Sequence, residues 1–111
     1  MPRDYRVYLE DMLEAIQKIH RYMEGLSFES FALEEKTVDA VVRNLEILGE
    51  AVKQIPDSLR LEYPQVDWSR IAGLRDILIH QYFGIDLTIV WDIVENKLPT
   101  LELQINQILS R

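Results

Sequence analysis

The chain has 111 residues, and its 12 Lys and Arg residues against 19 Asp and Glu residues give a formal net charge of −7. A chain of this length is expected to form one domain, here residues 1–111, and it can bury a core without disulfides. It contains no cysteine, which excludes a disulfide scaffold, a zinc ribbon, an iron–sulfur cluster and a thiol nucleophile. The acidic balance argues against non-specific nucleic-acid binding, so an RNA-binding role needs a local basic patch.

The sequence also predicts no membrane association. No run of 18 apolar residues is present, so no spanning helix is expected. The first residues, Met1–Arg6, reach an acidic side chain at once and precede no apolar block, which is not the pattern of a secretory signal. The absence of cysteine fits a reducing compartment, and we therefore expect a cytoplasmic protein.

Apolar residues recur at helical spacing in two long segments of the first half. The first segment predicts a helix over about Asp4–Glu24, ended by Gly25, and the second a helix over about Glu34–Gln54, ended by Pro56. Residues 27–31 are typical of a short capped turn between them. The apolar stripe of the second helix consists of Val38, Val41, Val42, Leu45, Leu48, Val52 and Ile55.

The second half of the chain continues the helical pattern. The connector over residues 56–64 is expected to hold one helical turn. Asp67 is a predicted N-cap for a helix over Asp67–Gly84, and Asp86 for the next one. Pro99 is expected to break or kink the last helical segment. No strand alternation is seen, and the pattern predicts an all-α, antiparallel bundle of four to five helices.

The most informative segment is residues 70–84. On a helix of 100° per residue, Arg75 lies only about 20° from Tyr82, inside a sector that is otherwise apolar. A guanidinium group there must be paired, or must face a cleft or a partner subunit. Asp76 and His80 are four residues apart on a second line, so the Asp76 carboxylate can accept a hydrogen bond from His80 and fix its tautomer.

Spacing alone leaves two interpretations of this segment. In the first, the Arg75 side chain extends to solvent, Asp76 and His80 form a surface pair, and Tyr82 is a core aromatic. In the second, Arg75 holds a phosphate and His80 moves a proton, which suits RNA cleavage without a metal or other cofactor. The ribose 2′-hydroxyl would attack the adjacent phosphate, with His80 as general base or acid.

The chain resembles the HepT-like family of the HEPN superfamily over about residues 3–109. Residues 75–82 read Arg-Asp-Ile-Leu-Ile-His-Gln-Tyr and match that family's R-x-x-x-x-H-x-Y motif without a gap. Other segments agree with the family in the same order along the chain. These segments are Tyr8–Asp11, Arg43–Ala51, Ile85–Leu87, Val90–Trp91 and Leu98–Pro99.

The resemblance implies a small helical bundle that forms a homodimer and is the toxin of a two-gene toxin–antitoxin module. Toxicity in this family is attributed to ribonuclease activity. By resemblance, Arg75 and His80 are catalytic in a cleft shared by both subunits, and Asp76 is a supporting polar residue. The resemblance also implies a partner, a minimal nucleotidyltransferase antitoxin, which neutralises the toxin by transferring AMP to Tyr82.

One chemical argument favours a shared cleft. A single motif histidine cannot supply a base and an acid together, whereas two-fold symmetry would bring a second His80 and a second Arg75 to the same place. Symmetry would also double the local positive charge, to which Arg70 is expected to add. Arg43 and Asn44, in the second predicted helix, either support this site or make an interhelical hydrogen bond.

Three functional hypotheses follow from the sequence. The first is a dimeric, metal-independent endoribonuclease toxin. The second is a non-catalytic module that binds nucleotide, RNA or the partner nucleotidyltransferase, with Arg75 and His80 as anion ligands. The third is a structural helical dimer in which the motif only packs.

Overall fold

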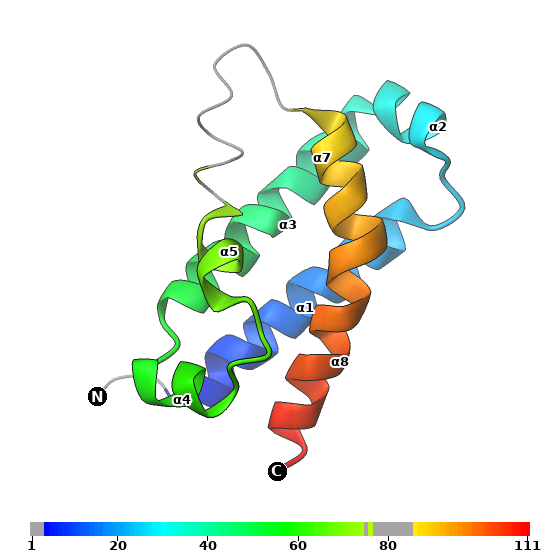
Figure 1. Ribbon diagram of the computed structural model, residues 1–111. Helices are drawn as coiled ribbons and strands as arrows, with labels where there is room; N and C mark the ends of the chain where they lie inside the picture. Colours follow the sequence, from blue (N-terminus) through cyan, green and yellow to red (C-terminus); the bar gives the residue numbers. More distant parts are fainter. Residues whose placement is uncertain (1–3, 75, 77–85) are drawn as a thin grey trace.

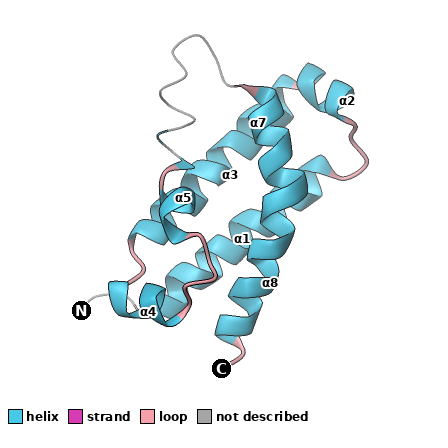
Figure 2. Cartoon of the chain, viewed as in Figure 1, coloured by secondary structure: helices cyan, strands magenta, loops and turns pink. Residues whose placement is uncertain are grey.

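The computed structural model describes residues 4–74, 76 and 86–111, and this part of the chain is helical and contains no strand (Figure 1, Figure 2). The all-α prediction is therefore confirmed. No helix in these ranges is long and apolar enough to cross a membrane. The helices are α1 (Tyr5–Met23), α2 (Phe28–Leu33), α3 (Glu35–Lys53), α4 (Asp57–Glu62), α5 (Trp68–Ala72), α7 (Leu87–Asp92), the π-helical turn η1 (Ile93–Lys97) and α8 (Leu98–Leu109).

The two long helices, α1 and α3, run antiparallel along most of their length (Figure 1). Their bounds agree with the prediction to within one residue at each end. The Asp4 carboxylate accepts a hydrogen bond of 3.0 Å from the Arg6 backbone N–H and so caps α1. Burial of each large apolar side chain between these helices contributes about 1.5–3 kcal/mol. The fully buried ones are Leu9, Met12, Ile16 and Ile19 of α1 and Val41, Leu45, Leu48 and Val52 of α3.

Helix α2 lies across one end of the bundle and is held there by aromatic side chains. Gly25 has a φ of 78° and ends α1, because a residue without a Cβ adopts this left-handed conformation readily. Ser27 then forms a capping box at the start of α2. The ring of Trp91 lies 5.8 Å from that of Phe28 and 5.9 Å from that of Phe31. These contacts attach α2 to α7.

The connector between α3 and α5 contains the helical turn that the sequence predicts, as α4. The Arg60 guanidinium donates hydrogen bonds to the carbonyl oxygens of Val52, at 2.8 Å, and Ile55, at 3.2 Å, at the end of α3. The Val52 carbonyl also accepts from the Ile55 backbone N–H, at 3.0 Å, so Arg60 adds a side-chain donor to the end of this helix. The buried Trp68 indole donates to the Tyr63 carbonyl at 3.0 Å. Side chains of the connector thus fix its course over the bundle.

Helix α5 begins next to Asp67, as predicted, but Asp67 does not cap it through its side chain. Its carboxylate instead lies 3.4 Å from the Arg70 Nε. Leu74 and Asp76 also have helical backbone. The remainder of the helix predicted over Asp67–Gly84 falls on residues outside the described part of the chain.

The last three elements form one continuous rod, which does not break at Pro99. Asp86 caps its start, as predicted. The turn before Pro99 is a π-helix, in which the Leu98 N–H donates to the Ile93 carbonyl five residues back. A proline ring collides with the carbonyl four residues before it, here that of Glu95, and widening the turn relieves this collision. A π-turn therefore replaces the predicted break or kink.

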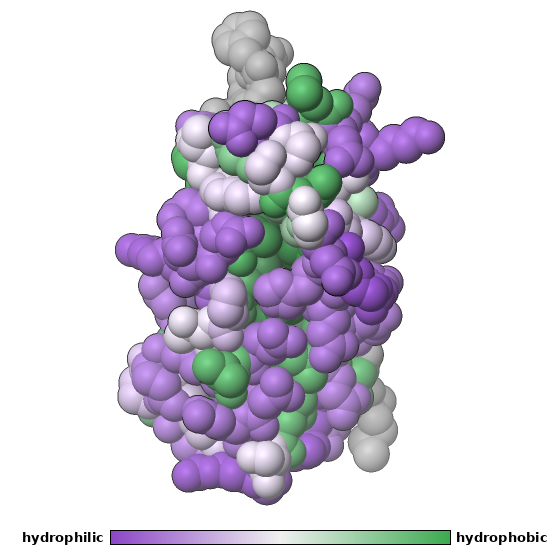
Figure 3. Space-filling view, turned by 90° about the vertical axis from the view of Figure 1, so that its right-hand side faces the viewer, coloured by the Kyte–Doolittle hydropathy of each residue, from purple (hydrophilic) through white to green (hydrophobic). Residues whose placement is uncertain are grey.

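The two ends of the described chain are joined by Arg6, whose Nη2 donates to the Leu109 carbonyl at 2.8 Å. This bond links the first turn of α1 to the last turn of α8, where the carbonyls lack helical partners. The face seen in Figure 3 is mostly hydrophilic, with hydrophobic atoms visible mainly in a narrow band between polar ridges. A few large apolar side chains are nevertheless well exposed in the described part, and Leu103 of α8, at 66%, is one of them.

Candidate functional site

Most of the motif lies outside the part of the chain that the structure describes. Arg75, His80 and Tyr82 are in this group, so the arrangement predicted for them stays a prediction. Asp76 is described, and its side chain is exposed. The described elements nearest the motif in sequence are α5, which leads into it, and α7, which follows it.

Arg43 and Asn44 are adjacent in α3 but lie in different environments. Asn44 is buried, and its Nδ2 donates a hydrogen bond of 2.9 Å to the carbonyl of Ala40, one turn earlier in α3. This bond lies within α3, and the interhelical hydrogen bond predicted as one of the two roles of Asn44 stays a prediction. Arg43 is exposed, and no carboxylate of the described residues lies within ion-pair distance of it.

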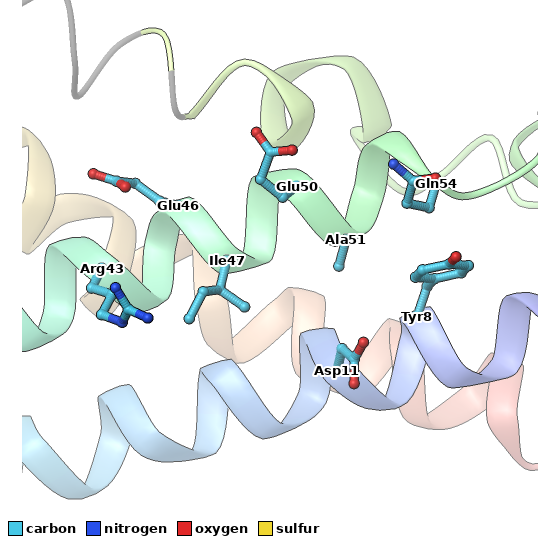
Figure 4. Close-up of a pocket in the computed structure, with 8 residues that line it drawn as sticks. All are labelled: Tyr8, Asp11, Arg43, Glu46, Ile47, Glu50, Ala51 and Gln54. Atoms are coloured by element: carbon cyan, nitrogen blue, oxygen red, sulfur yellow. The ribbon is translucent and has the colours of Figure 1, made fainter. Parts of the chain in front are cut away.

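A groove of about 620 Å³ runs between α1 and α3. In Figure 4, Arg43, Ile47 and Ala51 extend from α3 toward α1, and Tyr8 and Asp11 extend from α1 into the same space. Ile47 is an apolar side chain with 38% of its surface exposed. The groove is lined by Tyr8, Asp11, Arg43, Glu46, Ile47, Glu50, Ala51 and Gln54.

The groove joins two segments that are far apart in the sequence. Tyr8–Asp11 and Arg43–Ala51 both carry the family resemblance outside the motif, and here they face each other across it. Sequence reasoning used them only to recognise the family and did not identify the groove. The available signal was Ile47, an apolar residue outside the buried stripe of α3.

The walls of the groove are mixed in charge. Its charged side chains are one guanidinium, that of Arg43, and three carboxylates. Glu46 and Glu50 point away from α1, whereas Arg43 points toward it (Figure 4). The guanidinium of α3 therefore lies on the side of the helix that faces α1, and its two carboxylates lie on the other side.

A second cavity, of about 430 Å³, lies between α5, η1 and α8. Leu48 and Leu74 contribute to its apolar lining, and Arg70 also lines it. The sequence predicts that Arg70 adds to a positive patch near the motif. In the structure its Nε lies 3.4 Å from the Asp67 carboxylate, so this neighbour offsets part of its charge.

The described part of the chain resumes at Asp86, shortly after the motif. The Thr88 hydroxyl and then the Thr88 backbone N–H, at 3.0 Å, donate hydrogen bonds to the Asp86 carboxylate. These bonds stabilise the charged form and hold the pKa of Asp86 below its usual value of 3.8. The start of α7 is thus anchored by a side chain that remains ionised at neutral pH.

Comparisons with known proteins agree with the resemblance found in the sequence. Residues 12–108 match the family profile described as "Ribonuclease HepT-like". The chain is 46% identical over 111 residues to "Putative RNase MJ0127" of Methanocaldococcus jannaschii, covering 99% of this chain and 92% of that protein. It is 42% identical over 102 residues to "Probable ribonuclease HepT" of Thermococcus cleftensis, covering 92% and 93% of the two chains. No solved structure matches significantly. The chain belongs to the HepT-like ribonuclease family.

Proposed function

We propose that this protein is a toxin that cleaves RNA without a metal ion, and that its active site lies in a cleft shared by two copies of one single-domain chain. The observation that carries this proposal is the unbroken R-x-x-x-x-H-x-Y motif of residues 75–82 in a member of the HepT-like family. Relatives that are 42–46% identical over nearly the whole chain are named as ribonucleases, which supports the activity.

In the proposed reaction the ribose 2′-oxygen attacks the adjacent phosphorus atom. A new bond forms between the 2′-oxygen and phosphorus, and the bond from phosphorus to the 5′-oxygen breaks. His80 of one copy accepts the 2′-hydroxyl proton, and His80 of the other donates a proton to the leaving 5′-oxygen. Arg75 stabilises the additional negative charge on the phosphoryl oxygens. The products are a 2′,3′-cyclic phosphate and a 5′-hydroxyl.

The neighbouring polar residues would support this reaction rather than carry it. Asp76 is exposed, so its carboxylate is accessible to accept a hydrogen bond from His80. Arg43, exposed on α3, adds positive charge for the RNA backbone. The amide of Asn44 is buried and bonded to its own helix, and this favours a role in positioning α3 over direct contact with RNA.

Neutralisation is proposed to occur at Tyr82. The partner nucleotidyltransferase would transfer AMP from a nucleoside triphosphate, so that a bond forms between the tyrosyl oxygen and the α-phosphorus and diphosphate leaves. The product carries a bulky anion two residues from His80. It would block RNA by steric exclusion and by pairing with Arg75.

The activity is tested with the purified protein, free of its partner, incubated with total cellular RNA in EDTA. We expect cleavage by the wild type and none by His80→Ala, with cyclic phosphate or 3′-phosphate ends. The matched control is His20→Ala, because His20 is the other histidine of the sequence and lies on α1, 3.4 Å from Glu102 of α8. This variant should cleave like the wild type.

Two outcomes would overturn the proposed activity. Cleavage by His80→Ala at the wild-type rate would show that the motif histidine is not catalytic. No cleavage by a wild-type protein that is folded, dimeric and unmodified at Tyr82 would favour the non-catalytic binding module.

The modification site is tested separately with Tyr82→Phe, which lacks the hydroxyl that would receive AMP. This variant should remain toxic in cells but escape neutralisation by the partner nucleotidyltransferase. Mass spectrometry of the co-expressed wild type should find one AMP group on Tyr82. Neutralisation of Tyr82→Phe that requires the enzymatic activity of the partner would contradict the assignment.

A further inference from the structure

We infer that the cavity between α5, η1 and α8 binds an unpaired RNA base that carries an exocyclic amino group. This inference rests on the proposed function, because it names a part of the RNA that the same protein would recognise. Three observations support it: the position of the cavity in relation to the motif, its apolar walls, and the hydrogen-bonding groups that remain unused around it.

The first observation is that residues on both sides of the motif in sequence line this cavity. Leu74, which directly precedes Arg75 in the chain, lines it together with Ile71 of α5. Ile89 of α7, the helix that follows the motif, also lines it. A base bound here would therefore lie beside the elements that lead into and out of the proposed active site.

The second observation is that the cavity has apolar walls and a suitable size. Its volume of about 430 Å³ falls within the range of small-molecule sites, roughly 300–1,000 Å³. Leu48 and Leu74 are buried, whereas Ile89 leaves 39% of its surface exposed. Proteins hold unstacked bases between apolar or aromatic side chains. A base in the cavity would remove the exposed surface of Ile89 from water.

One face of the continuous rod of α7, η1 and α8 supplies much of this lining. In an α-helix, side chains at steps of four residues drift by about 40° per step. The π-turn takes up this drift and contributes Ile93, Asn96 and Lys97 to the cavity. Such turns occur frequently at functional sites. The lining positions of the rod at steps of four are 89, 93, 97 and 101.

The third observation concerns two amide side chains that line the cavity. The Asn96 Nδ2 donates a hydrogen bond to the Asp92 carboxylate at 2.6 Å. The Gln104 Nε2 donates to the Gln65 carbonyl at 3.2 Å. Both partners can only accept, so these bonds determine which end of each amide is the nitrogen. Among the described residues no donor reaches the Asn96 Oδ1 or the Gln104 Oε1, and both oxygens remain available as acceptors.

These acceptors favour a base with an amino group. The carboxylates of Asp67 and Asp92 also line the cavity, and they add further acceptor positions. Adenine, cytosine and guanine each donate from an exocyclic amino group, whereas uracil presents a carbonyl oxygen where cytosine presents its amino group. An acceptor that faces this oxygen would be desolvated without a partner, which is costly. The cavity is therefore expected to prefer cytosine over uracil.

Lys97 provides a positive charge for the phosphate of the bound nucleotide. No carboxylate of the described residues lies within ion-pair distance of Lys97, whereas Arg70 pairs with Asp67. A lysine ammonium holds phosphate as a point charge and does not read the base. The site thus separates binding strength, from Lys97, and base selection, from the two amides.

The inference is tested by fluorescence anisotropy with short single-stranded RNAs whose 2′-hydroxyls are all replaced by fluorine, so that they cannot be cleaved. Oligo(C) and oligo(U) of equal length are the probes, because their bases have the same shape and differ in the amino group. The wild type should bind oligo(C) roughly tenfold more tightly than oligo(U), as expected for one hydrogen-bonded base contact.

Two variants connect this preference to the cavity. Gln104→Leu removes one acceptor at similar volume and should reduce the preference for oligo(C). Ile89→Trp fills the cavity from an exposed position and should abolish it. The matched controls are Gln107→Leu and Leu103→Trp, which change exposed residues of α8 outside the cavity and should keep the preference. Circular dichroism confirms that all four variants are helical.

Lys97→Gln tests the second role. It should weaken the binding of oligo(C) and oligo(U) by the same factor and make binding less dependent on salt, since one phosphate contact is lost. A loss confined to oligo(C) would contradict the division between binding strength and base selection.

The remaining outcomes decide the inference separately from the proposed activity. Equal binding of the two probes by the wild type would overturn it, as would a preference that persists in full in Gln104→Leu or in Ile89→Trp. Displacement of oligo(C) by cytidine monophosphate at equal concentration would assign the cavity to a free nucleotide and overturn the RNA site.

None of these readouts requires cleavage. A protein that shows the preference but does not cleave ordinary RNA would support the base site and contradict the ribonuclease function. A protein that cleaves RNA but shows no preference would contradict the base site alone.

Discussion

At the residue scale, Arg43 and Asn44 show how a helix separates sequence neighbours. Consecutive residues of a helix differ by 100° in direction. One of these two side chains is therefore buried and bonded to the Ala40 carbonyl, while the other lies in the groove. The sequence indicated that both are polar residues among apolar ones. It did not indicate which of the two faces the core, because Val42 and Leu45 flank the pair on both sides.

Asp86 leads to a prediction about pH. Its carboxylate accepts hydrogen bonds from Thr88, and its pKa in the folded protein lies below the usual value of 3.8. The stabilisation that the charged cap provides is therefore complete above the unfolded-state pKa and is lost as the pH falls through the folded-state pKa. Asp86→Ala should unfold at a lower temperature than the wild type at pH 7, and this difference should shrink in strong acid. Thermal unfolding between pH 7 and pH 2 measures it.

The control for this prediction is Asp39→Ala, which removes an exposed carboxylate from α3. It should change the unfolding temperature at pH 7 less than Asp86→Ala does. A constant difference between Asp86→Ala and the wild type over the whole pH range would show that the loss comes from helix propensity and not from the ionised cap.

At the element scale, the helices could be predicted where the chain marks their ends with local chemistry. Gly25 and Asp86 act as predicted, and the turn predicted over residues 27–31 is capped by Ser27, because a cap needs only its own turn. Asp4 caps α1, a role that the sequence analysis did not assign to it. Asp67 differs, because its carboxylate pairs with Arg70. The sequence pattern of an N-cap does not show that a nearby arginine, here Arg70, competes for the same carboxylate.

The π-turn had a sequence signal that the helical pattern did not reveal. The buried residues Val90, Val94 and Leu98 follow each other at steps of four. An α-helix of 3.6 residues per turn drifts by about 40° at each such step. A wider turn takes up this drift, and Pro99 determines where it occurs.

The bond between Arg6 and the end of α8 gives a prediction about stability. Arg6→Ala leaves the Leu109 carbonyl without this donor and should lower the free energy of unfolding by about 1–2 kcal/mol, as expected for a hydrogen bond from a charged group. Urea unfolding followed by circular dichroism measures this change. Arg21→Ala, at an exposed position of the same helix, should change it by less than about 0.5 kcal/mol. Equal losses in Arg6→Ala and Arg21→Ala would mean that the effect comes from removing a positive charge and not from losing this hydrogen bond.

At the scale of the whole molecule, the helical class and the main core followed from the sequence, because the stripes of α1 and α3 repeat over many turns. The groove did not follow from it. The groove is made by residues that lie more than 30 positions apart in the sequence, and its shape depends on how the exposed edges of α1 and α3 lie relative to each other. Tyr8 and Ile47 line the same groove only when α1 and α3 pack. Arg75, His80 and Tyr82 followed from the motif, and their arrangement stays a prediction.

The π-turn in residues 93–97 has a consequence for how this rod tolerates change in length. It holds one residue more than an α-helical turn, which is what a single-codon insertion leaves in a helix. Deleting one residue there would return this turn to α-helical geometry and restore the collision with the Pro99 ring. Because the π-turn takes up its extra residue locally, α7 and α8 would keep nearly the same faces, and Trp91 would stay against Phe28 and Phe31. A deletion in a regular part of the rod would instead rotate α7 against α8 by about 100° and separate these rings.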